Sequence, residues 1–300
     1  MAGNIRAMKE GAASETTPLP RVARPSPASH VTVIQPPHGW PGLGLGELWR
    51  LRRICLVLTR RNLMVRYRQT IIGAAWSLIQ PILLTIVFTV FFGLLGRGDT
   101  DGLPFPVFYL LGLIPNQMLT KIMSEGTTSI VSNAPLITRV YFPRVYFPTS
   151  VALATLTDLA LGLIPIAALM LIYHVTPGPN IIFAPWLIAV GWFTGLGLSM
   201  LLSAWNVAYR DINQLLPFFT QLLMFLSPII YPSSIIPEPY RTLYFLNPLA
   251  LVVEGFRWAV VNAPPPPPYA WILGPVVAAI LVVVGYIVFK NRESTFADYV

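Results

Sequence analysis

Charged side chains are scarce in this sequence. Only 11% of its 300 residues are Asp, Glu, Lys or Arg, and 55% are apolar, whereas a typical soluble domain is about 25% charged. The mean hydropathy of +0.64 is that of an integral membrane protein. We therefore expect an all-α integral membrane protein whose core lies mostly in lipid.

Cysteine and the common catalytic motifs are also lacking. The single cysteine, Cys55, excludes an internal disulfide and a Cys-based metal cluster, and the three histidines are scattered. The sequence has no GxxxxGKS or GxxxxGKT motif, and no lysine follows a glycine, which excludes a P-loop. HExxH and GxSxG are missing as well. We expect no catalytic residue, no metal and no cofactor in this chain.

Composition divides the chain into four regions. Residues 1–46 are rich in Pro, Ala, Ser and Gly, which predicts a disordered tail without a cleavable signal. An amphipathic helix is expected within residues 47–73, a six-helix transmembrane domain over residues 74–290, and a C-terminal tail over residues 291–300. Each predicted span is close to the roughly 20 residues that cross a bilayer. The spans are residues 74–95, 105–131, 149–173, 181–205, 212–232 and 269–289.

Positive charge is unevenly placed. The net charge of +8 would suggest nucleic-acid binding in a soluble protein. Six spans, however, put 16 of the 20 Lys and Arg residues on the side of the two termini and three on the other side. The positive-inside rule then places both termini in the cytoplasm and makes membrane lipids, not nucleic acid, the expected surroundings.

Residues 47–68 have the pattern of a basic amphipathic helix. Apolar residues recur at the spacing of one helix face, and they are Leu48, Leu51, Cys55, Leu58 and Val65. Arginines crowd the other faces, among them Arg50, Arg53, Arg60 and Arg61. Such a helix would lie in the membrane interface with its arginines toward anionic headgroups. The alternative is that the arginines only set the orientation of the first span.

A tandem repeat lies between the second and third spans. RVYFP at residues 139–143 is followed directly by RVYFP at residues 144–148, within a stretch (133–148) that has two arginines, four aromatic residues and no acid. Aromatic groups beside arginine are typical of protein–protein contacts. We interpret the stretch as a docking element for a soluble partner; the alternative is a positively charged connector with aromatic interface anchors.

Residues 243–261 are apolar but interrupted. Asn247-Pro248 breaks the stretch, and each half is too short to span a bilayer, which predicts re-entrant helices on the outer side. Glu254 and Arg257 would form either a local salt bridge or a feature of a pore mouth. Five prolines at residues 264–268 predict a stiff connector.

Two ionisable residues lie deep within predicted spans. Lys121 and Asp158 are each roughly 14–15 Å from the inner end of their helix at 1.5 Å per residue. Because consecutive antiparallel helices are neighbours, we predict a buried Lys121–Asp158 pair, with Glu125 as a second partner for the lysine. The alternative for Asp158 is a proton relay.

Aromatic residues make up 12% of the chain. Those of the first and fifth spans would line a pore as sliding surfaces for sugar rings, or they are ordinary lipid-facing and belt residues. They are Phe88, Phe91, Phe92, Phe218, Phe219, Phe225 and Tyr231.

Five segments of the chain form a recognisable set. They are RYRQTIIGAAWSLIQPI (66–82), PLITRVYFPR (135–144), AYRDI (208–212), SPIIYP (227–232) and LNPLALVVEGFRWAV (246–260). Together and in this order, they resemble the membrane subunits of type-2 ABC exporters, and more closely the permeases that export O-antigen, capsular or teichoic-acid polysaccharides. The resemblance covers about residues 47–290 and leaves out the N-terminal tail and the penta-proline.

The resemblance implies a permease of the bacterial cytoplasmic (inner) membrane, in which a homodimer of this chain forms a channel for a lipid-linked polysaccharide. Two ATP-binding subunits beneath it would hold ATP and Mg²⁺. Residues 47–68 would feed the gate for the lipid anchor, and residues 243–261 would close the pore on the outside. The residues that would couple to the ATPase are Asn133, Leu136, Ile137, Arg139, Tyr141, Phe142, Arg144, Arg210 and Asp211.

Other functions stay open. A type-2 exporter of a small drug or lipid would share these motifs. An ion-coupled secondary transporter would use Asp158 and Lys121 and would stop under an uncoupler while ATP remains. A membrane-embedded glycosyltransferase would need more carboxylates than the outer loops offer. The carboxylates of these loops are Asp99, Asp101, Glu238 and Glu254.

Overall fold

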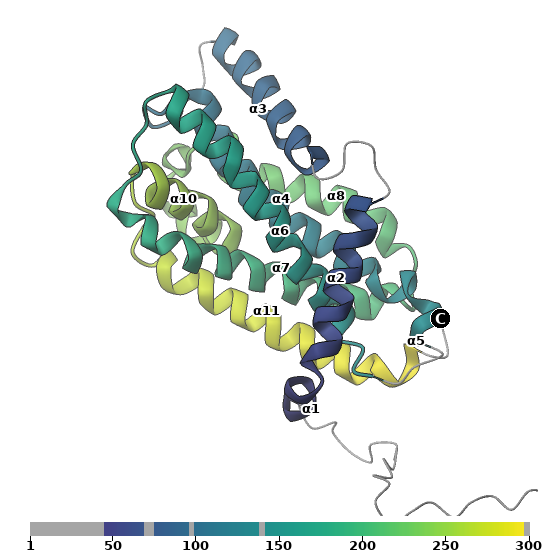
Figure 1. Ribbon diagram of the computed structural model, residues 1–300. Coiled ribbons are helices and arrows are strands. Elements are labelled where there is room, and N and C mark those ends of the chain that lie inside the picture. The colour runs from purple at the N-terminus through teal and green to yellow at the C-terminus, as the bar shows by residue number, and fades with distance from the viewer. Residues whose placement is uncertain (1–44, 69–74, 96–98, 138–141, 297–300) are drawn as a thin grey trace, which may run out of the picture. The chain divides into compact units, whose positions relative to one another are not determined.

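The computed structural model describes residues 45–68, 75–95, 99–137 and 142–296, and all regular structure within these ranges is helical, as predicted (Figure 1). The helices are α1 (Leu45–Arg50), α2 (Arg52–Arg68), α3 (Trp76–Leu95), α4 (Phe105–Ser132), α5 (Ala134–Ile137), α6 (Tyr146–Ile172), α7 (Ala184–Asn206), α8 (Ile212–Phe225), α9 (Glu238–Tyr244), α10 (Pro248–Val261) and α11 (Ala270–Arg292). Three short 3-10 helices are η2 (Pro179–Phe183), η3 (Ser233–Ile235) and η4 (Glu293–Thr295).

Four helical segments are long and apolar enough to cross a bilayer, and they match the first, third, fourth and sixth predicted spans. They are Trp76–Gly93, Tyr146–Ile172, Pro179–Asn206 and Ala270–Thr295. α4 has 28 residues, but its second half is polar and it is not among the four. The described residues therefore form a multi-pass membrane protein with four such spans, or five if the bent pair α9–α10 counts as one.

The helix of the fifth predicted span is shorter than predicted. We expected a span over residues 212–232, but α8 ends at Phe225 after 14 residues. Pro228 disfavours the helical conformation at Ser227, the residue before it. The carbonyl groups of Pro228 and Ile229 then accept hydrogen bonds from Arg257 of α10. This contact takes the place of a further helical turn.

α7 lies at the centre of the bundle, in contact with α4, α6, α10 and α11. Glycines of α7 lie at its contacts with α4 and α11. A Cβ added at Gly197 would lie 2.6 Å from backbone atoms of Leu281 and Val282 in α11, and one at Gly195 would lie 3.0 Å from Ile122 of α4. Small residues let helix backbones approach in this way, so α7 packs closely against α4 and α11 at these two glycines.

The predicted helix of residues 47–68 is two helices, α1 and α2, which are separated at Leu51. Cys55 and Leu58 are buried as expected, but Val65 is 60% exposed. The inward face instead continues through Asn62, which donates to Ser150 of α6 at 3.0 Å. The exposed arginines include all four that were predicted to face headgroups, namely Arg50, Arg53, Arg60 and Arg61.

The predicted break at Asn247-Pro248 is confirmed, because α9 and α10 meet there at 102°. The Asn247 side chain caps α10 by accepting a hydrogen bond from the backbone N–H of Leu249 at 3.1 Å. α10 ends at Val261, and the next residue, Asn262, has a left-handed φ of 55°. A pair bent this sharply is a broken span or a re-entrant loop.

Candidate functional site

Asp158, in the middle of α6, is the centre of a cluster of ionisable side chains. Its carboxylate accepts a hydrogen bond from Lys121 Nζ at 3.2 Å, and others from the Arg66 guanidinium and the Tyr67 hydroxyl of α2. Arg66 also forms an ion pair with Glu125. The structure thus brings Lys121 and Asp158 together, and it adds two residues of α2 that sequence reasoning had not assigned to the site.

The cluster contains two cations and two carboxylates, and buried charges need such compensation. Only 7% of the Asp158 side chain is exposed. Burial and the hydrogen bond to Asp158 raise the pKa of Tyr67 to about 12, so the phenol stays protonated and donates. A carboxylate held by three donors is suited to fixing α2 against α4 and α6, and it is poorly suited to relaying a proton.

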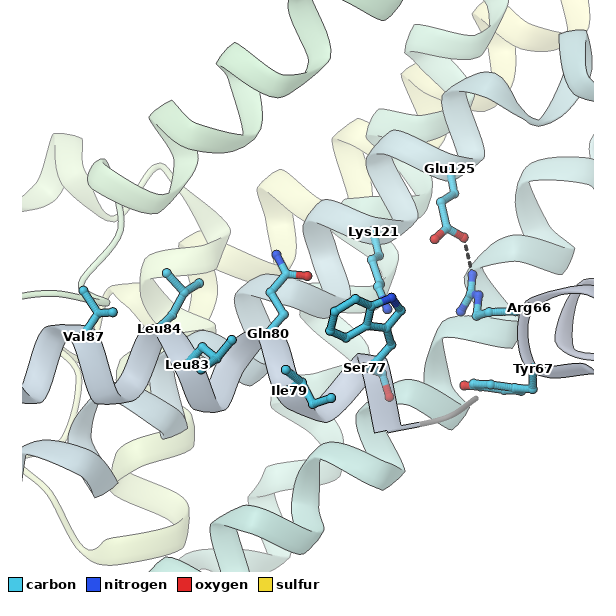
Figure 2. A pocket seen from close by; sticks show the side chains of 11 residues that line it. Arg66, Tyr67, Ser77, Ile79, Gln80, Leu83, Leu84, Val87, Lys121 and Glu125 are labelled. Atoms are coloured by element: carbon cyan, nitrogen blue, oxygen red, sulfur yellow. Dashed lines mark hydrogen bonds and ion pairs between the residues drawn. The ribbon is translucent and has the colours of Figure 1, made fainter. Parts of the chain in front are cut away.

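A groove of about 590 Å³ lies beside this cluster, between α2, α3 and α4 (Figure 2). Arg66, Lys121 and Glu125 lie at one end of the groove, and apolar side chains of α3, such as Leu83 and Val87, line the other end. Ligand sites are mostly apolar with a few placed polar groups. A groove with one charged end and one apolar end fits an amphipathic ligand.

Two further cavities continue along α4. One of about 290 Å³ lies between α3, α4 and α8 and includes Gln80, Gln117 and Gln221. The other, of about 420 Å³, lies between α4 and the first half of α8. The polar residues of α4 that line the groove and these cavities are Asn116, Gln117, Thr120, Lys121, Ser124, Glu125 and Thr128. Three- and four-residue steps place them along one side of the helix, which we call the polar face of α4.

The aromatic residues predicted to line a pore fall into two groups. Phe88 and Phe92 pack on Tyr109 of α4, with ring centroids 5.5 and 6.0 Å from the tyrosine ring. Tyr231 is half-buried and donates its hydroxyl to the backbone oxygen of Phe225 at 2.7 Å. The exposed rings are those of Phe91, Phe218, Phe219 and Phe225. They belong to α3 and α8, the two helices that flank the polar face.

Several residues predicted to couple to an ATPase lie at the end of the bundle that holds α5 (Figure 1). The side-chain oxygen of Asn133, just before α5, accepts a hydrogen bond from Arg61 of α2. Ile137 and Phe142 are each 7% exposed, so their side chains pack within the chain, whereas Leu136 is half-buried. Arg139 and Tyr141 lie outside the described residues.

Arg210 and Asp211 are exposed in the short connection between α7 and α8. Arg144 is half-buried, and its backbone N–H donates to Glu293 Oε1 at 2.8 Å. Among the described residues that were predicted to couple to an ATPase, Arg210 and Asp211 are therefore the most exposed. Arg144 is instead hydrogen-bonded to Glu293, after the end of α11.

Arg257 of α10 is 3% exposed. Its guanidinium lies 3.5 Å from the ring centroid of Phe108 and donates to the backbone oxygens of Phe108, Pro228 and Ile229. Glu254 Oε1 accepts a hydrogen bond from the Ser233 N–H at 2.7 Å. The two charged residues therefore hold the segment between α8 and α9.

The sequence matches one protein family and is similar to several polysaccharide transport proteins. A sequence model of the ABC-2 type transporter family matches residues 53–261. The chain is 29% identical over 256 residues to the O-antigen export system permease protein RfbA of Klebsiella pneumoniae, covering 85% of this chain and 96% of that protein. The RfbA of Myxococcus xanthus is 27% identical over 84% of this chain and 97% of its own length. The polysialic acid transport protein KpsM of Escherichia coli is 25% identical over 67% of this chain and 78% of its own length.

Proposed function

Because the chain belongs to the ABC-2 type transporter family and is thus a transport subunit, we propose that it forms the channel of an ATP-driven exporter of a lipid-linked cell-surface polysaccharide. In this family, the use of ATP lies with an ATP-binding partner. The similar proteins are named for O-antigen export and for polysialic acid transport, which supports a glycan as the substrate.

The polar face of α4 is the observation that carries this proposal. Polar side chains at membrane depth mark substrate pathways or water-filled cavities. Amide and hydroxyl groups such as those of Gln117 and Thr120 both donate and accept hydrogen bonds, as sugar hydroxyls require. The flanking rings of α3 and α8 offer apolar surfaces to the faces of sugar rings. A path of this composition suits a glycan better than an ion.

The groove between α2, α3 and α4 supports a lipid-linked form of the substrate. Its apolar end along α3 would receive hydrocarbon, and its charged end would receive a phosphate group beside Arg66 and Lys121, which form strong charge-assisted hydrogen bonds. The exposed arginines of α2 would lie toward anionic headgroups of the bilayer. An exporter of a small lipid is the second candidate, because it would need this groove but not the polar face.

The assembly we propose is a homodimer with two ATP-binding subunits that hold ATP and Mg²⁺. Two copies would enclose the polar face between them, and α9 and α10 would form the outer re-entrant pair. The ATP-binding subunits would dock at the α5 end, near the exposed Arg210 and Asp211. This end and both termini would then lie in the cytoplasm of a bacterial cell, beneath its inner membrane.

The proposal is tested by surface display of the polymer in the source organism. Cells that lack this chain should hold lipid-linked glycan in the inner leaflet, and the wild-type chain should restore surface polymer. The double substitution Gln117→Leu and Gln221→Leu should lower export about tenfold, the effect of losing about 1.4 kcal/mol of stabilisation along the path. Gln214→Leu, at an exposed position of α8 that lines none of these cavities, is the matched control.

Two results would contradict the glycan path. One is normal polymer export by the doubly substituted chain. The other is a chain-deletion strain that displays normal polymer but loses export of a small lipid, which would establish the second candidate instead.

A further inference from the structure

The C-terminal end of α11 is fastened to the second copy of the RVYFP repeat. Glu293, in η4, accepts a hydrogen bond from the backbone N–H of Arg144 through Oε1 at 2.8 Å. Its other carboxylate oxygen pairs with Lys290 Nζ at 2.5 Å. The backbone oxygen of Glu293 accepts a hydrogen bond from the Arg144 guanidinium at 2.5 Å. One residue thus receives both the main chain and the side chain of Arg144.

Aromatic contacts hold the same segment. Phe296 is 1% exposed, and its ring lies 5.2 Å from that of Phe289 in α11, edge to face. The Arg144 guanidinium lies 5.9 Å from the Phe296 ring, within the range of a cation–π contact. Residues 290–296 therefore form a packed segment, which we call the strap.

The strap also reaches the end of α7. Arg292 lies over the ring of Trp205, with its guanidinium carbon 4.5 Å from the centroid. Trp205 in turn stacks on Tyr209 at 6.2 Å, directly before the exposed Arg210. The strap therefore contacts the residues just before α6 through Arg144 and the end of α7 through Trp205. These contacts adjoin the α5–α6 and α7–α8 connections, the two loops where an ATP-binding subunit is proposed to dock.

We propose that the strap joins these two loops into one mechanical unit and that Glu293 is its positioning residue. The inference rests on the proposed function, since it assigns to the strap a role in passing motion from the ATP-binding subunit to the helices. α5 alone has only four residues, whereas α11 lies along α7. A displacement of either loop would move α6, α7 and α11 together only while Glu293 is hydrogen-bonded to Arg144.

The test compares Glu293→Ala, Glu293→Gln and Ser294→Ala in the complete complex with its ATP-binding subunit. Glutamine keeps an acceptor for the Arg144 N–H, and Ser294 is an exposed neighbour in the same segment. We expect all three variants to capture the ATP-binding subunit as the wild type does. Polymer exported per ATP hydrolysed should fall at least about fivefold for Glu293→Ala, the lower range of coupling effects, while Glu293→Gln retains most of it and Ser294→Ala is unchanged.

A second measurement reports on the strap without transport. In a Cys55→Ser background, which removes the only cysteine, a spin label on Ser294→Cys should be immobile and should become mobile when Glu293→Ala is added. An unchanged label, or an unchanged ratio of export to hydrolysis in Glu293→Ala, overturns the proposal. If the wild-type chain captures no ATP-binding subunit, the proposed function fails instead, and the spin label still reports separately whether Glu293 holds the strap.

Discussion

Asp158 receives hydrogen bonds from Lys121 of α4 and from Arg66 and Tyr67 of α2. The sequence indicated Lys121 because opposite charges buried on consecutive spans stabilise each other when they pair. It did not indicate Arg66, because the six other arginines of residues 47–68 suggested a uniformly outward basic face. The spacing of Cys55, Leu58 and Asn62 does lead to residue 66 on the inward face, and this spacing is the signal that could have found it.

The three donors predict an asymmetry between substitutions in this cluster. Asp158→Ala leaves two cations without their shared acceptor and should destabilise the protein by about 3 to 5 kcal/mol. Lys121→Ala leaves Asp158 with two donors and should cost about 1 kcal/mol. Thermal unfolding of the purified chain in mild detergent measures both. Equal losses would show that Lys121 is the main partner of Asp158.

Exchanging the two charges should rescue the fold only in part. The double variant Asp158→Lys and Lys121→Asp restores an ion pair between the two positions. The new lysine, however, offers no acceptor to Arg66 and Tyr67, which both donate to Asp158 in the wild type. The double variant should therefore remain less stable than the wild type in the same unfolding assay. Full rescue would contradict the role of α2 in the cluster.

Arg257 gives a second prediction at the residue scale. Its planar guanidinium donates to three backbone oxygens at once, and a lysine cannot reproduce this geometry. Arg257→Lys should cost about 3 kcal/mol, as expected for losing hydrogen bonds of a buried charged group. The control is Arg53→Lys, at an exposed position of α2, and its cost should stay below about 1 kcal/mol. Differential scanning fluorimetry should show a large drop in midpoint for the first variant only.

At the scale of elements, helix contacts at glycine were predictable and helix ends were less so. The spacing of Gly191, Gly195 and Gly197 along α7 is enough to predict close approach, because only small residues permit it. Pro228 is a local signal for the early end of α8, but the contact with Arg257, which is more than 25 residues away in sequence, could not be predicted from local pattern. The polar face of α4 was visible as a run of polar residues, but the cavities beside it required the positions of α3 and α8.

The contact between α7 and α11 yields a paired prediction. Gly197→Ala would place a Cβ 2.6 Å from backbone atoms of α11 and should destabilise the protein by about 1 to 3 kcal/mol through overpacking. Gly93→Ala adds a Cβ with no heavy atom within 4 Å, and it should be neutral or stabilise α3 by up to about 1 kcal/mol. Unfolding midpoints of the two variants in detergent check the contrast, and a neutral Gly197→Ala would show that the two helix backbones do not touch at this glycine.

At the scale of the whole molecule, the exposed rings of α3 and α8 predict a second copy of the chain. Phe219 is 45% exposed beside the polar face. In a Cys55→Ser background, Phe219→Cys should give disulfide-linked dimers in native membranes under mild oxidation, because each α8 would face the channel shared with its partner. Ile272→Cys, at an exposed position of α11, is the control and should remain monomeric. Efficient cross-linking of the control alone would place the dimer contact elsewhere.

We propose above that this permease works with a separate ATP-binding subunit. The most direct measurement is purification of the tagged chain from its native membranes in mild detergent, with quantitative mass spectrometry of the proteins that accompany it. We expect an equimolar partner with a GxxxxGKS or GxxxxGKT motif, and we expect Arg210→Glu together with Asp211→Arg to weaken this capture. If the chain is purified intact and as a dimer but with no ATP-binding protein, it does not work with such a subunit and the proposed function is wrong.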